Sequence, residues 1–250
     1  MFEPWTVLVV FGAFLFAGAV KGVTGLGLPT VSLALLVVAL DLPTAMALLL
    51  IPTLVTNLWQ SVVGGNAKVI LIRLWPFLLM TIVTVWIGVL ALARLDFALL
   101  TGLLGALLVI YSLVSLGGIR LTVPPRHEVW AGPLAGSVSG VLTGMTGSFI
   151  VPGVMFLQAI GLPRDVLIQA MGISFIACTA ALAIALQQSN FFSVEHAILS
   201  AGAVVPAIVG MVGGQALRKR ISEQRFRTVF FIALLLLGAY IVVNAIRSLL

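Results

Sequence analysis

Two turns rich in glycine and threonine interrupt the hydrophobic sequence, and they lie about 120 residues apart. The first runs from Gly18 to Pro29 and the second from Gly136 to Ser148. Glycines let backbone N–H groups approach a ligand without interference from a Cβ atom. A helix that begins directly after such a turn adds unpaired N–H donors and a partial positive charge. This combination is typical of a site for a small anion.

Each turn is followed by a short apolar segment and then by a second turn that contains proline. The short segments cover residues 28–40 and 148–160, whereas crossing a hydrocarbon core takes about 20 helical residues. A pair of short, interrupted hydrophobic segments in matching positions of two halves indicates the binding site of a secondary transporter. We therefore expect both segments to be broken or re-entrant helices near the bilayer midplane.

The candidate substrate-binding residues are those of the two turns, together with two amides in the segment 43–63. For the glycines, close helix packing is the alternative role. For the hydroxyls and amides, the alternative is hydrogen bonding within the protein. The candidates are Thr24, Gly25, Gly27, Pro29, Asn57, Gln60, Thr143, Gly144, Thr146, Gly147 and Ser148.

Three further expectations concern residues around the turns. The spacings Gly18-xxx-Gly22 and Gly136-xxx-Gly140 favour close helix packing over substrate contact. Ser148 is expected to cap the segment that it begins. Lys21 could attract an anion, but its long side chain is expected to reach cytoplasmic water, which requires no function.

No acidic residue lies in the middle of a long apolar segment. Proton-coupled carriers usually keep an ionisable group inside the helix bundle, so neither a carboxylate proton relay nor a cation substrate is expected. His127 and His196 also lie at segment junctions. We therefore expect no metal site, no cofactor and no catalytic residues, and hence no enzyme. The seven acidic residues are Glu3, Asp41, Asp96, Glu128, Asp165, Glu195 and Glu223.

The composition is that of a membrane protein. Hydrophobic residues make up 62% of the chain and charged residues 8%, whereas an ordinary soluble domain has about 25% charged residues. The net charge of +6 comes from basic residues scattered at segment ends, so it does not indicate nucleic-acid binding. The single cysteine, Cys178, is interpreted as a small packing residue, with a reactive thiol as the alternative.

Apolar runs separated by polar residues, glycine or proline predict ten segments, of which eight are about long enough to span a membrane. The sequence thus predicts an all-α polytopic membrane protein. It would have a first membrane repeat over 1–119, a cytoplasmic connector over 120–128 and a second repeat over 129–250. The segments are 5–22, 28–40, 43–63, 69–93 and 97–117 in the first half, and 129–144, 148–160, 164–188, 194–217 and 226–247 in the second.

The basic residues indicate how these segments are oriented. Eleven of the thirteen lysines and arginines fall after odd-numbered segments, and the positive-inside rule places such loops in the cytoplasm. Both termini are then outside the cell. Because each half has an odd number of segments, the halves would run in opposite directions. Two inverted repeats with broken helices are typical of alternating-access transporters.

The motifs resemble those of the TauE/SafE sulfite exporter family, also called TSUP, over essentially the whole chain. The resemblance implies a permease of the bacterial or archaeal inner membrane that exports sulfite, sulfoacetate, thiosulfate or a similar anion. In the first motif, Leu28-Pro29 stands where the family usually has a second glycine run. The two halves are therefore expected to contribute unequally to the substrate site. The motifs are Gly18-Ala-Val-Lys-Gly22-Val-Thr-Gly25-Leu-Gly27 with Pro29, and Gly140-Val-Leu-Thr-Gly144-Met-Thr-Gly147-Ser-Phe-Ile-Val-Pro152 leading to Ile160-Gly-Leu-Pro163.

These observations together predict a secondary transporter that exports small sulfur-containing oxyanions such as sulfite or organosulfonates. The two turns would meet near the midplane and hold the anion through backbone N–H and hydroxyl groups. An anion channel built from the same site is one alternative, and a membrane redox or assembly protein that uses Cys178 is another. The expected partners are the anion and the lipid bilayer but no nucleic acid, and a homodimer is compatible with the sequence.

Overall fold

The ten apolar segments predicted from the sequence all form helices in a computed structural model, which describes residues 3–119, 121–218, 220 and 222–249. Arg120 and Lys219, which contribute to the predicted sidedness, lie outside the described residues. The helix boundaries agree with the predicted ones to within a few residues. The largest shift is at the sixth segment, which begins at Pro125 rather than 129, because proline suits the first position of a helix.

The chain divides into two compact units, and each takes helices from both halves of the sequence. Unit 1 consists of Met1–Pro52, Asp96–Ile119 and Phe191–Leu250, and unit 2 of Thr53–Leu95 and Arg120–Asn190. Unit 1 thus holds the first part of α3 (Leu42–Val62) and the following whole elements: α1 (Pro4–Thr24), α2 (Leu28–Ala39), α5 (Phe97–Leu116), α9 (Val194–Gly202), α10 (Val204–Arg218) and α11 (Glu223–Leu249).

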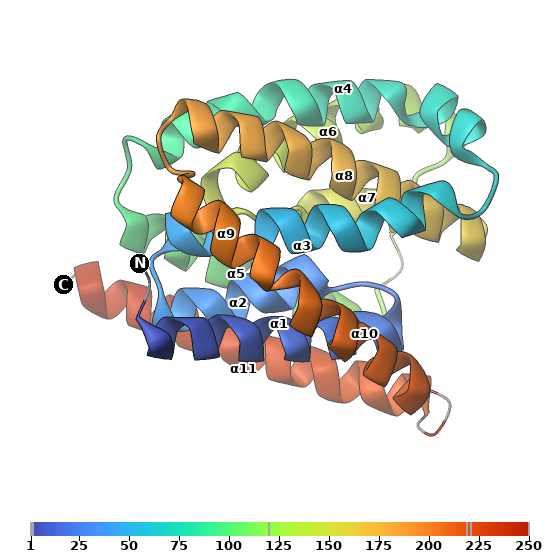
Figure 1. Cartoon of the computed structure of the whole chain (residues 1–250). Helices are drawn as coiled ribbons and strands as arrows, with labels where there is room; N and C mark the ends of the chain where they lie inside the picture. The colour runs from blue at the N-terminus through green and yellow to red at the C-terminus, as the bar shows by residue number, and fades with distance from the viewer. Residues whose placement is uncertain (1–2, 120, 219, 221, 250) are drawn as a thin grey trace. The chain divides into compact units, whose positions relative to one another are not determined.

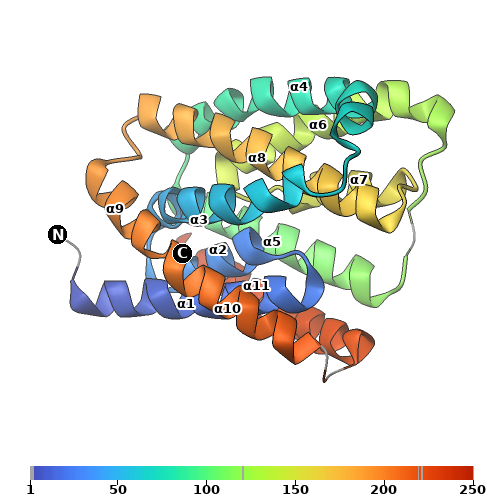
Figure 2. The same cartoon turned by 45° about the vertical axis from the view of Figure 1, so that its right-hand side comes forward.

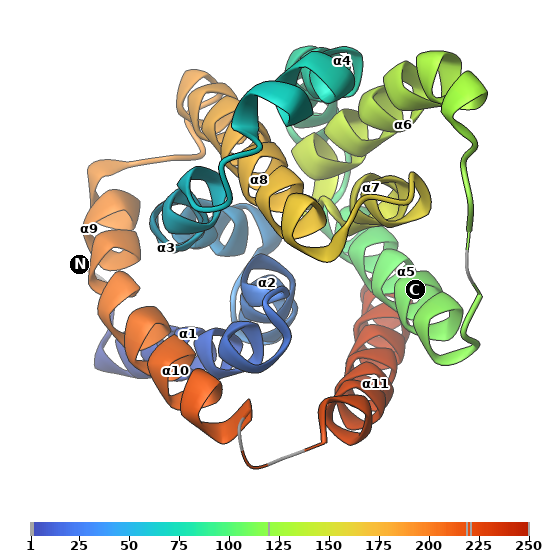
Figure 3. The same ribbon diagram turned by 90° about the vertical axis from the view of Figure 1, so that its right-hand side faces the viewer.

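Unit 2 holds the remainder of α3 and the elements that carry the second glycine turn. They are α4 (Ala67–Leu92), α6 (Pro125–Thr146), the π-helical turn η1 (Ile150–Val154), α7 (Met155–Ala159) and α8 (Arg164–Gln188). Within this unit α4 lies along α6 and also packs on α8, as Figures 1 and 2 show. Within unit 1, α1 lies along α10 and α5 along α11 (Figure 3).

Helix length and composition confirm a polytopic membrane protein. Among the described residues, seven stretches are long and apolar enough to cross a membrane: α1, α3, α4, α5, α8, α9 with α10, and α11. The eighth predicted span, α6, has 22 residues but is not among the seven, because its glycines, serines and charged first turn lower its hydropathy. The two predicted short segments are confirmed as the apolar helices Leu28–Ala39 and Ile150–Ala159.

The ninth predicted segment is not one helix but two, because α9 ends at Gly202 and α10 begins at Val204. Pro206 explains the break. It has no backbone N–H to donate to the carbonyl of Gly202, four residues earlier, and its ring crowds that carbonyl. The predicted segment itself is confirmed, since Val194–Arg218 is one of the stretches long and apolar enough to cross a membrane.

One helix pair in each unit is held together by glycines at its interface. In unit 1, a Cβ atom at Gly18 or Gly22 of α1 would overlap the backbone carbonyl oxygens of α10, and one at Gly210 or Gly214 of α10 would overlap those of α1. The predicted packing role of Gly18 and Gly22 is thus confirmed. Such contacts between small residues are the usual basis of helix association in a membrane.

The pair α4 and α6 in unit 2 is built in the same way. A Cβ at Gly136, Gly140 or Gly144 of α6 would overlap the carbonyl oxygens of Phe77, Thr81 and Val85, respectively. In both units, therefore, the first long helix of one half packs on the fourth segment of the other half. This shared pairing supports an internal repeat, whose inverted orientation stays a prediction.

Two adjacent glycines of α10 test this packing. Replacing Gly214 by alanine should destabilise the protein by about 1–3 kcal/mol, because overpacking a tight interface has that cost. Gly213→Ala is the matched control, since a Cβ there meets no atom within 4 Å and alanine is the better helix former. Thermal unfolding in detergent measures both, and equal melting temperatures for the two variants would contradict the packing role of Gly214.

Candidate functional site

The two glycine turns have the same local backbone structure. Helix α1 ends at Gly25 with φ +80°, and α6 ends at Gly147 with φ +74°. In each case the glycine N–H donates to the carbonyl four residues earlier: Gly25 to Lys21 at 2.7 Å and Gly147 to Thr143 at 2.8 Å. Positive φ strains any residue that carries a Cβ atom. Glycine is therefore required at both positions by the backbone alone.

The threonine before each glycine makes two hydrogen bonds that the turns share, and the Thr24 hydroxyl also lies 2.7 Å from the Leu26 carbonyl oxygen. Thr24 Oγ1 donates to the Val20 carbonyl at 2.9 Å, and Thr146 Oγ1 donates to the Leu142 carbonyl at 2.7 Å. Each threonine oxygen also accepts from the N–H two residues later, that of Leu26 at 3.2 Å and that of Ser148 at 3.3 Å. Both threonines thus stabilise the turn, and their hydroxyl protons are engaged.

Ser148 differs from the three predicted threonines because its hydroxyl has no hydrogen-bond partner. Its side chain is 3% exposed, and its Oγ is one of three buried side-chain oxygens or nitrogens without a partner in the described part of the chain. Thr143 Oγ1, in contrast, donates to the Ser139 carbonyl at 2.7 Å. The expected cap by Ser148 is not formed, because η1 begins only after Phe149 and has no side-chain cap.

The predicted glycines have different surroundings. A Cβ at Gly25 would meet no atom within 4 Å, so space is open beside this turn. A Cβ at Gly144 would overlap the Val85 carbonyl oxygen instead, so the packing alternative holds for Gly144. Gly27 has φ +96° and precedes α2, where Pro29 occupies the first turn. Proline is tolerated there because the first helical N–H groups have no partner within the helix.

The two predicted amides on α3 take part in helix packing. Gln60 Nε2 donates to the Ile168 carbonyl of α8 at 2.8 Å, and Gln169 Nε2 of α8 donates back to the Ser61 carbonyl at 2.9 Å. Asn57 Nδ2 donates to the Thr53 carbonyl of its own helix at 2.9 Å. Their amide donors are therefore used within unit 2, as the alternative role requires. Unit 2 also holds the second turn, whereas Thr24, Gly25, Gly27 and Pro29 belong to unit 1.

Lys21 does not reach water as expected, because its side chain is only 5% exposed. It lies four residues before Gly25, the position that Thr143 occupies before Gly147. A lysine buried inside a membrane protein is costly and commonly marks an ion or substrate path. The first turn therefore differs from the second by a buried basic side chain.

The acidic side chains lie away from the interior. Of those that the structure describes, Glu128 is half-buried, while Glu3, Asp41, Asp96, Asp165 and Glu195 are exposed. Asp41 and Asp96 accept hydrogen bonds from backbone N–H groups at the starts of α3 and α5. Glu128 binds Arg73 with both oxygens, at 2.6 and 2.9 Å, and Arg73 also donates to the Ile160 carbonyl just beyond α7. Arg73 and Glu128 thus link α4 and α6 to the residue that follows α7, at the end of the short segment 148–160.

Cys178 and Ser174 of α8 are near the second turn, a relation that the sequence does not reveal. The Cys178 thiol is buried and lies close to the Thr143 side chain. Ser174 lies one helical turn before Cys178, is 1% exposed and has no partner for its Oγ. The only signal for Ser174 in the sequence is a hydroxyl within an apolar segment. Burial also favours the packing role predicted for Cys178.

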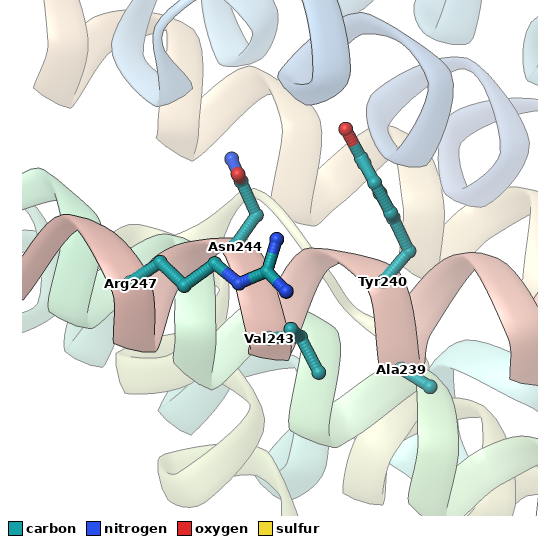
Figure 4. A pocket seen from close by; sticks show the side chains of 5 residues that line it. All are labelled: Ala239, Tyr240, Val243, Asn244 and Arg247. Atoms are coloured by element: carbon teal, nitrogen blue, oxygen red, sulfur yellow. The ribbon is translucent and has the colours of Figure 1, made fainter.

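One surface hollow lies outside these turns and is lined by α11 alone, through Ala239, Tyr240, Val243, Asn244 and Arg247. Tyr240 and Asn244 point to the same side of the helix in Figure 4. Tyr240, Asn244 and Arg247 are exposed, so the hollow does not enclose a ligand. Among the described residues, no group of three or more His, Cys, Asp or Glu side chains could hold a metal ion.

The strain at the first turn can be measured with two glycines of α1. Gly25→Ala should destabilise the protein by about 1–2 kcal/mol, the cost of a Cβ atom at positive φ, and Gly25→Asn should recover part of this because asparagine tolerates that conformation. Gly12→Ala is the control, since Gly12 also has open space around its Cβ position but lies inside the helix. A melting temperature of Gly25→Ala equal to that of Gly12→Ala would show that the turn is not strained.

Comparison with known protein families gives a match over most of the chain. The family model described as sulfite exporter TauE/SafE matches residues 10–241, which is most of the 250-residue chain and includes both glycine turns. No curated protein and no solved structure matches the chain significantly.

Proposed function

Because the chain belongs to the TauE/SafE sulfite exporter family, we propose that it exports a small sulfur-containing oxyanion, such as sulfite or an organosulfonate. The proposal places it in the bacterial or archaeal inner membrane, with both termini outside. The family and the seven long apolar helices establish a membrane transporter of the sulfite-exporter type. The substrate, the direction of transport and the sidedness are parts of the proposal.

The repeated Thr-Gly turn is the observation that carries the proposal. In each unit, a long helix ends in a left-handed glycine and a helix too short to cross the membrane follows. Non-helical backbone at membrane depth is tolerated only where it is buried in protein or lines a cavity. Both turns therefore occupy protected places, at which N–H groups near a helix start favour an anion.

Lys21 supplies the charge in this proposal. Its side chain is buried one helical turn before Gly25, where an anion and an ammonium group would compensate each other's loss of hydration. Thr143 at the corresponding place in unit 2 is neutral. We infer that the first turn attracts the anion mainly through charge, and the second mainly through hydroxyl and N–H donors.

The exposed acidic residues favour efflux without a coupling proton. An inside-negative membrane potential drives an anion outward, with about 2.3 kcal/mol per charge at 100 mV. For a singly charged anion this corresponds to about a 50-fold ratio of concentrations at equilibrium. A carrier that lets the anion cross the membrane down its electrochemical gradient, without a coupling ion, would then suffice. We propose this mechanism for the chain.

Flux into liposomes tests the function. Vesicles with the purified protein should take up sulfite saturably, and an outside-negative potential should increase the uptake. Sulfate, thiosulfate, taurine and sulfoacetate in the same assay define the substrate class, and Cys178→Ser should remain active because the thiol is buried in the packing. Folded protein that moves none of these compounds would contradict the proposal, and loss of flux in Cys178→Ser alone would favour a thiol-dependent function.

Lys21 provides a second test, with charge as the variable. Lys21→Met should weaken sulfite binding at least tenfold, because it removes a buried positive charge near the first turn, while Lys21→Arg should retain most of the affinity. Lys68→Met is the control, since Lys68 is an exposed lysine at the start of α4. The measurement is the sulfite dependence of thermal unfolding. Unchanged affinity in a folded Lys21→Met protein would remove Lys21 from the site.

A further inference from the structure

Two buried serine hydroxyls of unit 2 lack hydrogen-bond partners. Ser148 follows the second glycine turn and Ser174 lies inside α8, and their side chains are 3% and 1% exposed. A buried hydroxyl without a partner costs about 1–3 kcal/mol. The other buried serines among the described residues have an acceptor, as Ser112 has in the Leu108 carbonyl of its own helix at 2.8 Å.

Two contacts show that this face of α8 lies near the second turn. The Cys178 thiol lies close to the Thr143 side chain, whose Oγ1 is 3.3 Å from the Ser148 carbonyl oxygen. The rings of Phe149 and Phe175, the residues that follow the two serines, pack edge to face with their centroids 5.4 Å apart. Ser174 is four residues before Cys178, and residues at that spacing share one face of a helix.

The third buried hydroxyl without a partner, that of Thr53 on α3, is not connected to the turn by such contacts. Gln60 of α3 meets α8 at Ile168, before Ser174 in the chain, and Thr53 is two helical turns from Gln60. Ser148 and Ser174 are considered together because the contacts described above join their segments, and those contacts involve no residue of α3.

We propose that Ser148 and Ser174 donate their hydroxyl protons to oxygens of the transported anion, so that Ser174 is a specificity-determining residue of the site. The inference rests on the proposed function and adds a contact from α8, a helix that contributes no residue to the glycine motifs. Two O–H donors suit an oxyanion with at least two free oxygens on one sulfur atom. Hydrogen bonds to a charged acceptor are also stronger than neutral ones.

The two threonine hydroxyls of the second turn have a different role from the two serine hydroxyls. Thr143 and Thr146 donate to backbone carbonyls of their own helix, so they shape the turn rather than offer protons to a ligand. Ser148 and Ser174 offer their protons when no anion is present. The anion would then supply the missing acceptors, and its binding would remove the cost of two unpartnered hydroxyls.

The test compares single serine-to-alanine variants of the full-length protein in detergent. Sulfite is titrated against thermal unfolding, with sodium chloride at equal ionic strength as the reference. Ser148→Ala and Ser174→Ala should each weaken sulfite binding about tenfold, equivalent to about 1.4 kcal/mol. Neither should lower stability without sulfite, since no hydrogen bond is lost. Ser112→Ala is the matched control and should bind sulfite with the affinity of the unchanged protein.

The outcomes separate this inference from the proposed function. Wild-type affinity in Ser174→Ala, while the unchanged protein binds and transports sulfite, would overturn the role of Ser174 and leave the transporter proposal intact. Absence of both binding and flux in the unchanged protein, for every sulfur oxyanion in the panel, would overturn the proposed function and this inference with it. Should Ser174→Ala unfold, Ser174→Thr, which keeps the hydroxyl, is titrated instead. It should bind sulfite more tightly than Ser174→Val, which has the same shape without the hydroxyl, and equal affinity of these two folded variants would contradict the inference.

Discussion

Close contact between helix backbones at glycine is the constraint on which the rest of the structure depends. In a membrane, helices gain nothing by burying apolar side chains against each other rather than against lipid, so packing at small residues has to hold them. Gly22 anchors the last turn of α1 to α10, and Gly144 anchors the last turn of α6 to α4. Each lies three residues before the left-handed glycine that ends its helix. The same interface that holds each unit together thus fixes where its turn lies.

The two turns share a backbone and differ in the side chains around it. Both use threonine to accept the N–H of the second following residue and glycine to end the helix. Beyond this common structure, unit 1 has the buried Lys21, whereas unit 2 has Thr143 at that place and Ser148 after the turn. The unequal contribution of the two halves to the site, expected from the departure at Leu28-Pro29, stays a prediction.

The ionic groups of the chain support the scaffold rather than the proposed path. Arg73 and Glu128 join α4, α6 and the residue after α7, and Asp41 and Asp96 bind the first N–H groups of the helices that they precede. Such roles need access to water or a partner of opposite charge, and these side chains are exposed or half-buried. A substrate that carries its own negative charge is best bound where competing carboxylates are absent, and the described interior of both units meets that condition.

The sequence by itself determined the ten segments, the two short helices, the turns and the packing glycines, because hydrophobic length and glycine spacing act locally along the chain. The segment 194–217 is one of these ten, and its backbone breaks between α9 and α10, just before Pro206. The tertiary structure decided what depends on distant neighbours. It buried Lys21, turned Gln60 toward Ile168, assigned Gly144 to packing and paired the first helix of each half with the fourth segment of the other. It also left the Ser148 and Ser174 hydroxyls without hydrogen-bond partners. The partner of a hydroxyl is whichever group the fold brings within about 3 Å, and no local sequence pattern specifies that group.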